Sequence, residues 1–130
     1  MKKIIAFICV HNSCRSQMAE AFGKIYLSEK FECCSAGTER KPEINHDAVR
    51  IMKEHFCIDM ESQYSKLISD IPDPEIVVTM GCNVKCPNIP CKVRLDFGID
   101  DPTGKSDEEF IKTANLIKEK VMNLKEQMLG

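Results

Sequence analysis

The sequence has no long apolar run and no excess of charge of one sign. No stretch approaches the roughly 20 apolar residues that a membrane-spanning helix needs, so no membrane association is expected. The net charge of the 130 residues is −2 at pH 7, and basic residues form no stripe, which argues against nucleic acid as a partner. Internal repeats, low-complexity tracts and linkers are also lacking. These features predict a single domain over residues 1–130.

We expect no export signal either. The sequence opens with lysines and an apolar run, but the run ends in His11-Asn12-Ser13-Cys14-Arg15 rather than in a small-residue cleavage site. We therefore interpret residues 3–9 as a buried strand and expect a cytoplasmic protein. Eight cysteines are abundant for a chain of 130 residues. In the cytoplasm such thiols are typical of catalysis, redox chemistry or metal binding rather than of structural disulfides.

Apolar periodicity alternates between strand and helix along the chain. Strands are expected at 3–9, 31–35, 76–80 and 93–97, where short apolar runs are bounded by polar or turn residues. Helices are expected from residue 16, over 45–56 and after a capping-box pattern at Ser106 and Glu109. This alternation predicts an α/β fold with an open four-stranded parallel sheet and helices on both faces.

The most informative motif joins the first strand to the first helix and reads Cys9-Val10-His11-Asn12-Ser13-Cys14-Arg15-Ser16. Successive N–H groups in such a loop, together with the helix N-terminus, favour a bound tetrahedral oxyanion. We expect residues 10–16 to bind it, with Arg15 gripping two oxygens and Cys9 held as a nucleophilic thiolate. The alternative is that Cys9 only ends a core strand. A second Cys-x5-Arg match, from Cys34 to Arg40, has no helix after it and is interpreted as accidental.

The segment CVHNSCRSQMAE resembles the phosphate loop and first helix of thioredoxin-coupled arsenate reductases, which share the fold of the low-molecular-weight tyrosine phosphatases. The resemblance continues through residues 35–37, 78–80, Cys86-Pro87 and 98–102. It implies reduction of arsenate by a relay of thiols, with Cys9 as the nucleophile, Cys82 as the second thiol and Cys86 as the third. It also implies thioredoxin or a similar dithiol protein as the final reductant, and no cofactor.

The cysteines after the third strand decide between reduction and hydrolysis. Reducing arsenate takes two electrons, so a second thiol must displace the product and form a disulfide, whereas phosphate hydrolysis needs one thiol and water. The segment between Cys82 and Cys86 is shorter than in the family, which makes Cys91 an alternative third thiol. A low-molecular-weight phosphatase that hydrolyses phosphate monoesters is the first alternative function. The second is a metal-binding module in which these three cysteines hold zinc with Cys14 or a histidine.

Asp101 is the candidate general acid. In the phosphatase relatives, the aspartate before the corresponding proline protonates the leaving oxygen, and Pro102 follows Asp101 here. The alternative is a plain Asp-Pro turn before the last helix. Thr103 stands where tyrosine phosphatases carry an aromatic residue beside the substrate ring, which disfavours a tyrosine phosphatase.

A potassium site of some related reductases is altered in this sequence. The oxygen ligands of those relatives match Asn12, Glu20 and Ser35, whereas a threonine and an aspartate align with Tyr64 and Lys66. We expect the ammonium group of Lys66 to lie near Glu20, where an opposite charge within about 4–6 Å is favourable. Arsenate reduction would then be independent of K⁺. The alternative is that Lys66 points to solvent, as most lysines do.

Overall fold

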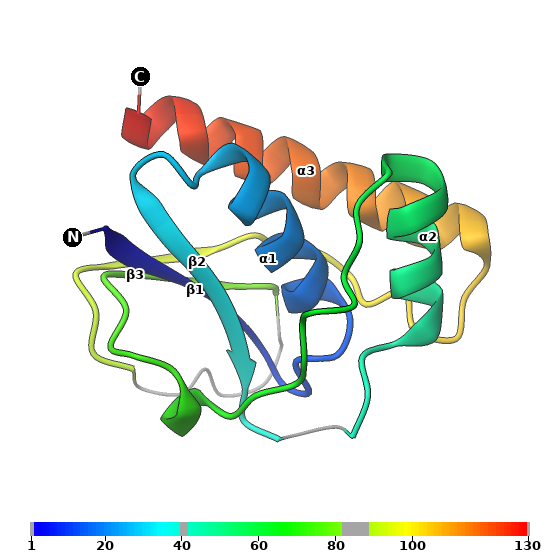
Figure 1. Ribbon diagram of the computed structural model, residues 1–130, viewed down its shortest axis with the longest axis horizontal. Coiled ribbons are helices and arrows are strands. Elements are labelled where there is room, and N and C mark those ends of the chain that lie inside the picture. Colours follow the sequence, from blue (N-terminus) through cyan, green and yellow to red (C-terminus); the bar gives the residue numbers. More distant parts are fainter. Residues whose placement is uncertain (1, 40–41, 82–88, 130) are drawn as a thin grey trace.

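The computed structural model describes residues 2–39, 42–81 and 89–129 of the chain. They contain a four-stranded sheet in the order β2-β1-β3-β4, in which every neighbouring pair is parallel (Figure 1). The strands are β1 (Lys3–Cys9), β2 (Phe31–Gly37), β3 (Ile76–Thr79) and β4 (Val93–Asp96). The helices are α1 (Arg15–Tyr26), α2 (His46–Phe56), the short 3-10 helix η1 (Ile68–Asp70) and α3 (Asp107–Leu129).

β1 lies inside the sheet because its side chains are apolar on both faces. Ile5 and Phe7 pack into the larger core on one face, whereas Ala6 and Ile8 belong to a smaller apolar cluster on the other. All four side chains are at most 2% exposed. A strand that is buried on both faces needs cover from both sides, and this decides where the helices and loops must lie.

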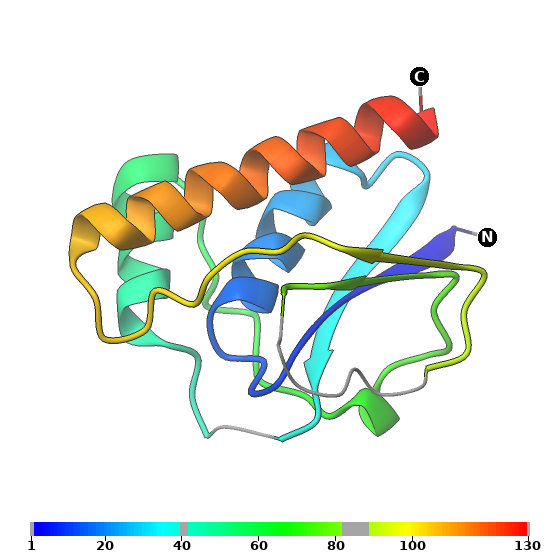
Figure 2. The same ribbon diagram turned by 180° about the vertical axis from the view of Figure 1, so that it is seen from behind.

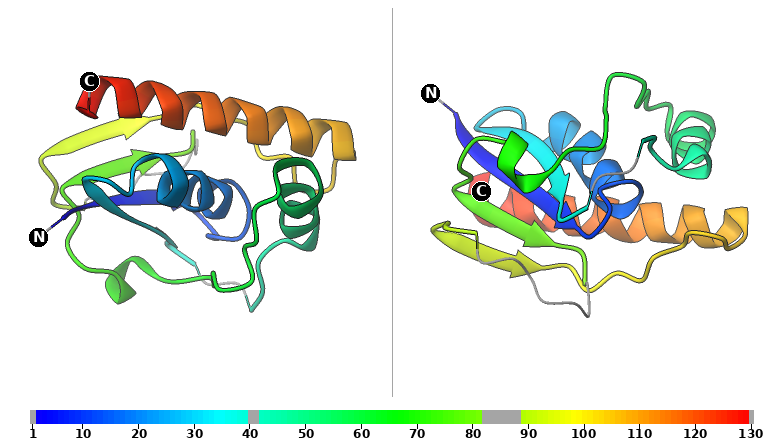
Figure 3. Two further views of the ribbon diagram at one scale, coloured as in Figure 1. Left: turned by 45° about the horizontal axis from the view of Figure 1, so that its top comes forward. Right: turned by 90° about the horizontal axis from the view of Figure 1, so that it is seen from below.

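The three α-helices cover the face of the larger core (Figures 1 and 2). α1 packs on β1 and β2 and beside α3, and α2 packs against α3. Phe22 of α1 and Phe110 and Ile117 of α3 are buried in the larger core. The opposite face carries η1, whose Ile68 packs against the smaller cluster (Figure 3, left). None of the helices in the described ranges is long and apolar enough to cross a membrane.

The expected sheet and its alternation with helices are confirmed, and the differences lie at element ends. The second helix begins at His46 because Asn45 is its N-cap, whose side-chain oxygen accepts the N–H of Ala48 at 3.1 Å. The last helix begins at Asp107, and Ser106 Oγ accepts the N–H of Glu109 at 3.4 Å. Helical cover on the two faces is unequal, because among the described residues only η1 lies opposite the three α-helices. A three-residue helix is too short to give a periodic signal, so the sequence pattern does not predict η1.

The carboxyl ends of β1, β3 and β4 are joined at one edge of the sheet. Met80, which follows β3, donates its N–H to Ile8 of β1 at 3.2 Å. Phe97, which follows β4, donates its N–H to Thr79 of β3 at 2.8 Å, and Ile99 donates to Met80 at 3.1 Å. Ligands of open α/β sheets bind at this edge. The fold therefore brings the loop after β1 together with the segments that follow β3 and β4.

Candidate active site

The loop of residues 10–14 connects the end of β1 directly to the first residue of α1. Cys9, the last residue of β1, is 6% exposed. Asn12, in the middle of the loop, is fully buried and has a φ angle of 52°, in the left-handed region that asparagine tolerates better than most residues. The chain therefore turns sharply between the buried strand and the N-terminus of α1, where the partial positive charge of the helix lies.

The backbone carbonyl groups of the loop face outward. Residues 10–13 all accept hydrogen bonds at 2.8–3.1 Å from groups outside the loop. The donors are the N–H groups of Glu39 and Asn45, the hydroxyl of Ser65 and the side-chain amide of Gln17. In a trans peptide a carbonyl and the following N–H point in opposite directions, and the described chain has no cis peptide bond. The N–H groups of residues 11–14 therefore turn toward the inside of the loop, where an oxyanion would meet them.

A chain of side-chain hydrogen bonds ends on the sulfur of Cys9. Asn12 donates from Nδ2 to Ser16 Oγ at 2.9 Å, and Ser16 Oγ lies 2.8 Å from Cys9 Sγ. Because a hydroxyl has one hydrogen and two acceptor lone pairs, Ser16 Oγ can accept from Asn12 and also either donate to the Cys9 sulfur or accept from it. The thiolate is the nucleophilic form of cysteine, and a thiolate sulfur can only accept, so in that form Ser16 would be the donor to Cys9.

Gly37, the last residue of β2, lies directly against the loop. It is the register partner of Cys9 in the sheet. A Cβ atom on Gly37 would lie 2.5 Å from the carbonyl oxygen of Val10 and 2.9 Å from that of Cys9. This close approach requires glycine, and it accounts physically for the Ser35-Ala36-Gly37 element of the resemblance.

Arg15 joins the loop to the segments after β3 and β4. Its Nη1 donates to the carbonyl oxygens of Met80 at 3.0 Å and Ile99 at 2.6 Å. Both bonds use the same nitrogen, and within the described ranges Nε and Nη2 make no hydrogen bond. A guanidinium held by one nitrogen keeps two others for a bidentate contact with an oxyanion.

Asp101 lies close enough to the loop for its charge to act on Cys14. Cys14 is 4% exposed, and burial first of all, followed by the Asp101 carboxylate and the Cys9 sulfur, raises the pKa of its thiol to about 12. Thr103 fixes the Asp101 side chain by donating to Oδ1 from its N–H at 3.0 Å and from its hydroxyl at 2.7 Å. The carboxyl group expected to act as the acid therefore stands beside the loop that would hold its substrate.

Known proteins are similar to this chain over nearly its whole length. The family model described as low molecular weight phosphotyrosine protein phosphatase matches residues 4–129. This chain belongs to that family. A Bacillus cereus protein named arsenate reductase is 40% identical over an alignment of 130 residues, and the match covers 96% of this chain and 96% of the relative. "Arsenate reductase 1" of Staphylococcus epidermidis is 43% identical over 122 residues, or 90% of this chain and 91% of the relative. A solved structure, "An arsenate reductase in the phosphate binding state", is 34% identical and matches with a TM-score of 0.87, covering 97% of this chain and 98% of the other.

The low molecular weight phosphatase family accounts for the all-parallel sheet and for the loop after β1. The resemblance to arsenate reductases that the motif indicates is confirmed by these relatives, which span nearly the whole chain. The family model alone does not separate reduction from hydrolysis, because the loop serves both reactions. That distinction depends on the additional cysteines.

Two of the expected relay thiols, Cys82 and Cys86, lie outside the described residues. Gly81, the residue before Cys82, follows β3 closely and donates its N–H to Asp96 Oδ1 at 2.8 Å. Cys91 is half-buried and packs against the smaller apolar cluster. Within the described ranges no group of three or more histidine, cysteine or acidic side chains is placed to hold a metal ion. The alternative zinc site uses Cys82 and Cys86, which lie outside the described residues, so this finding does not bear on it.

Lys66 and Gln17 complete the surroundings of the loop. Lys66 lies beside Glu20 as expected, with Nζ 3.4 Å from Oε1. Gln17 is fully buried, and its Nε2 donates to Asn12 Oδ1 at 2.9 Å and to the carbonyl of Tyr64 at 2.9 Å. The sequence pattern does not identify Gln17 as a loop support. The one feature of the sequence that could have pointed to Gln17 is that it is a polar residue in the first turn of the helix that follows the motif.

Proposed function

We propose that this protein reduces arsenate to arsenite with electrons from its own thiols. The observation that carries the proposal is the loop of residues 10–16, whose carbonyl groups are bonded to groups outside it and which follows a buried cysteine hydrogen-bonded to Ser16. The loop occurs in a chain that is similar over nearly its full length to proteins named arsenate reductase. A tetrahedral oxyanion matches the donors of the loop and the positive end of α1. Arsenate is such an ion.

The first step forms a bond between sulfur and arsenic. The loop N–H groups and the guanidinium of Arg15 offset the negative charge of arsenate, which otherwise repels a thiolate. The Cys9 thiolate attacks arsenic, and one arsenate hydroxyl group takes a proton from Asp101 and leaves as water. Arsenic is still As(V) in this covalent adduct, so no electron has yet been transferred to it.

The second step reduces arsenic. The Cys82 thiolate attacks the Cys9 sulfur and forms a Cys9–Cys82 disulfide, while the electron pair of the sulfur–arsenic bond passes to arsenic and arsenite leaves. Cys86 then attacks Cys82, which releases the Cys9 thiolate and leaves a Cys82–Cys86 disulfide. The roles of Cys82 and Cys86 rest on the resemblance, and Cys91 is the alternative third thiol.

An external dithiol protein closes the cycle. It reduces the final disulfide by thiol–disulfide exchange and so supplies the two electrons that arsenate consumed. Thioredoxin has this chemistry and is the proposed partner. We assign the enzyme to the cytoplasm, because that compartment keeps thiols reduced. One domain over residues 1–130 carries all of the proposed groups, and the electrons come from thiols without a cofactor.

Hydrolysis of phosphate monoesters is the second candidate function. The family model favours it, and the loop with Cys9 and Arg15 is equally suited to one-thiol chemistry. Thr103 argues against a phosphotyrosine substrate, because this small side chain is engaged with Asp101 and offers no aromatic surface to a phenyl ring. The two functions share the first thiol and differ in the need for a second.

Matched serine variants test the proposal. Cys9→Ser should abolish both arsenate-dependent oxidation of thioredoxin and phosphate-ester hydrolysis, because a serine hydroxyl does not ionise near pH 7. Cys82→Ser should abolish arsenate turnover and spare any ester hydrolysis. Cys57→Ser, at an exposed cysteine after α2, is the control and should retain wild-type rates. Ester hydrolysis without arsenate reduction in the wild type, or arsenate turnover by Cys9→Ser, would refute the proposal.

A further inference from the structure

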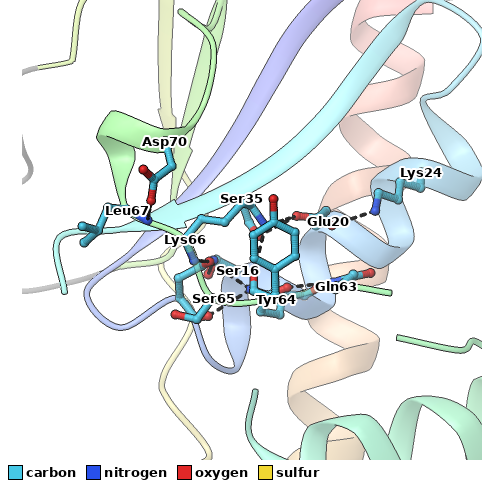
Figure 4. A network of polar contacts seen from close by, with 12 residues as sticks. Ser16, Glu20, Lys24, Ser35, Gln63, Tyr64, Ser65, Lys66, Leu67 and Asp70 are labelled. Carbon is cyan, nitrogen blue, oxygen red and sulfur yellow. Dashed lines mark hydrogen bonds and ion pairs between the residues drawn. The ribbon is translucent and has the colours of Figure 1, made fainter. Parts of the chain in front are cut away.

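Lys66 is a buried lysine with several partners (Figure 4). Its side chain is 9% exposed, whereas lysines are almost never buried unless their charge is paired. The ammonium group lies 3.4 Å from Glu20 Oε1 and donates to the carbonyl oxygen of Tyr64 at 2.9 Å. It also lies 4.4 Å from the centroid of the Tyr64 ring, a distance at which a cation is attracted to the ring face.

The backbone of the same residue holds the Cys9 loop. The N–H of Lys66 donates to Asn12 Oδ1 at 2.8 Å, and its carbonyl accepts the N–H of Gly37 at 2.9 Å. The side chain therefore fixes Lys66 to α1 through Glu20, while the backbone fixes the loop to the end of β2. Lys66 thus connects these three elements by bonds from a single residue.

The connection reaches the nucleophile through two further hydrogen bonds. Asn12 receives the Lys66 N–H on Oδ1 and donates from Nδ2 to Ser16 Oγ at 2.9 Å. Ser16 Oγ in turn lies 2.8 Å from Cys9 Sγ. A shift of the Lys66 backbone would turn the Asn12 amide and weaken its hydrogen bond to Ser16, the residue in contact with the Cys9 sulfur.

Glu20 also distinguishes Lys66 from a second lysine. Lys24 lies 2.8 Å from the other carboxylate oxygen of Glu20, but its side chain is 48% exposed and the pair joins two residues of the same helix. Glu20 Oε1 additionally accepts the hydroxyl of Ser35 at 2.7 Å, so the carboxylate that receives Lys66 is itself held by β2. Both lysines offset the charge of Glu20, and only Lys66 is bonded to the loop.

We infer that Lys66 is a positioning residue that serves as a fixed internal cation beneath the oxyanion loop. The inference rests on the proposed oxyanion chemistry of that loop. The ammonium group lies between the Glu20 carboxylate and the Tyr64 carbonyl oxygen and keeps the Lys66 N–H bonded to Asn12. Asn12 in turn holds Ser16 in contact with Cys9. Because this cation is covalently part of the chain, wild-type rates should be equal in K⁺ and Na⁺ at constant ionic strength.

The test compares Lys66→Met with Lys24→Met, which removes an ammonium group from the same carboxylate. The first measurement is the rate of Cys9 alkylation by iodoacetamide and its protection by inorganic phosphate, followed by mass spectrometry of the Cys9 peptide. The second is kcat/KM for arsenate. Lys66→Met should weaken phosphate protection and lower kcat/KM by about tenfold or more, because small displacements of reacting groups are costly. Lys24→Met should stay within about twofold, since exposed ion pairs contribute little.

Two further measurements separate positioning from a general loss of stability. In Lys66→Met, ammonium ions should restore part of the Cys9 reactivity by entering between the oxygens of Glu20 and Tyr64, whereas the larger tetramethylammonium ion at equal ionic strength should not. The double variant Glu20→Gln/Lys66→Met removes both charges, so it should recover thermal stability but keep the slow and poorly protected Cys9. A double variant with wild-type Cys9 behaviour would show that stability alone was affected.

The outcomes also separate this inference from the proposed function. A wild type whose Cys9 is not protected by phosphate or arsenate would count against the oxyanion loop itself. A protected wild type together with an unaltered Lys66→Met, or with an equally impaired Lys24→Met, would overturn the positioning role of Lys66. Activation of the wild type by K⁺ would do the same.

Discussion

Replacing Gly37 with alanine should disable the oxyanion loop while the sheet still folds. Gly37 ends β2 beside Cys9, and an added Cβ would lie 2.5 Å from the Val10 oxygen, 2.9 Å from the Cys9 oxygen and 3.0 Å from the Asn12 nitrogen. All three atoms belong to the backbone, so none can rotate away as the end of a flexible side chain would. The clash must therefore move the loop or the end of the strand.

The size of the effect follows from these distances. An ordinary carbon–oxygen contact is about 3.3 Å or longer, so the Val10 carbonyl has to retreat by roughly 0.8 Å. Overpacking of this kind typically costs about 1–3 kcal/mol of stability. A displacement approaching 1 Å near the reacting atoms costs up to about 100-fold in rate. We therefore expect kcat/KM for arsenate to fall roughly 10- to 100-fold at a modest loss of stability.

The assay pairs arsenate-dependent thioredoxin oxidation with the urea midpoint of unfolding. Gly23→Ala in α1 is the matched control, since its Cβ would meet Cys33 Sγ at 2.9 Å and a Phe7 ring carbon at 3.0 Å. These are side-chain atoms remote from the loop, and alanine favours a helix interior by about 1 kcal/mol over glycine. The control should keep wild-type activity. A folded Gly37→Ala variant with wild-type kcat/KM would refute the argument that this close contact holds the loop in its active form.

Two further predictions concern other thiols. After one equivalent of arsenate, Cys86→Ser should stall with Cys9 and Cys82 joined in a disulfide, whereas an enzyme with Cys91→Ser should still turn over. Mass spectrometry of the trapped disulfide distinguishes the two cases. The reverse pattern would make Cys91 the third thiol of the relay. Burial raises the pKa of Cys14 and Cys33 from the ordinary 9.0 to about 12, so the folded state keeps protons that the unfolded state releases. Their contribution to stability is therefore intact below pH 9 and falls as the pH rises toward 12, by up to about 1.4 kcal/mol per pH unit and thiol. Urea midpoints measured under reducing conditions between pH 8 and pH 10.5 should decline less steeply for Cys33→Ala, and equal slopes would contradict this account.

Much of the fold can be predicted from the sequence because its signals are local. The apolar run of β1 is complete within its seven residues, and its two buried faces follow from the lack of polar side chains after Lys3. The start of α2 is marked by Asn45, which can be recognised as a cap without any tertiary information. Cys9 and Arg15 can be identified for the same reason, since their spacing, the preceding strand and the following helix are continuous in the chain.

The supports of the loop cannot be predicted in this way because they come from distant segments. Ser65 and Lys66 bond to His11 and Asn12 across 54 residues, from a stretch without a regular strand or helix that leaves no periodic pattern. Their roles follow from backbone atoms, which carry no residue-specific signal. The exception is the proximity of Lys66 to Glu20, which can be anticipated only through a resemblance that aligns the two positions.

The structure also explains why the thiol inside the loop does not interfere with the proposed relay. Cys14 is near Cys9, and a thiol there that attacked the Cys9 sulfur would compete with Cys82. Only a thiolate attacks efficiently, and a thiol with a pKa of about 12 is ionised in about one molecule per 10⁵ at pH 7. Burial is the main cause of this high pKa, and the Asp101 carboxylate adds to it. The loop therefore places the Cys9 sulfur beside Ser16 while its second cysteine stays protonated, and the proposed relay takes its second thiol from another segment of the chain.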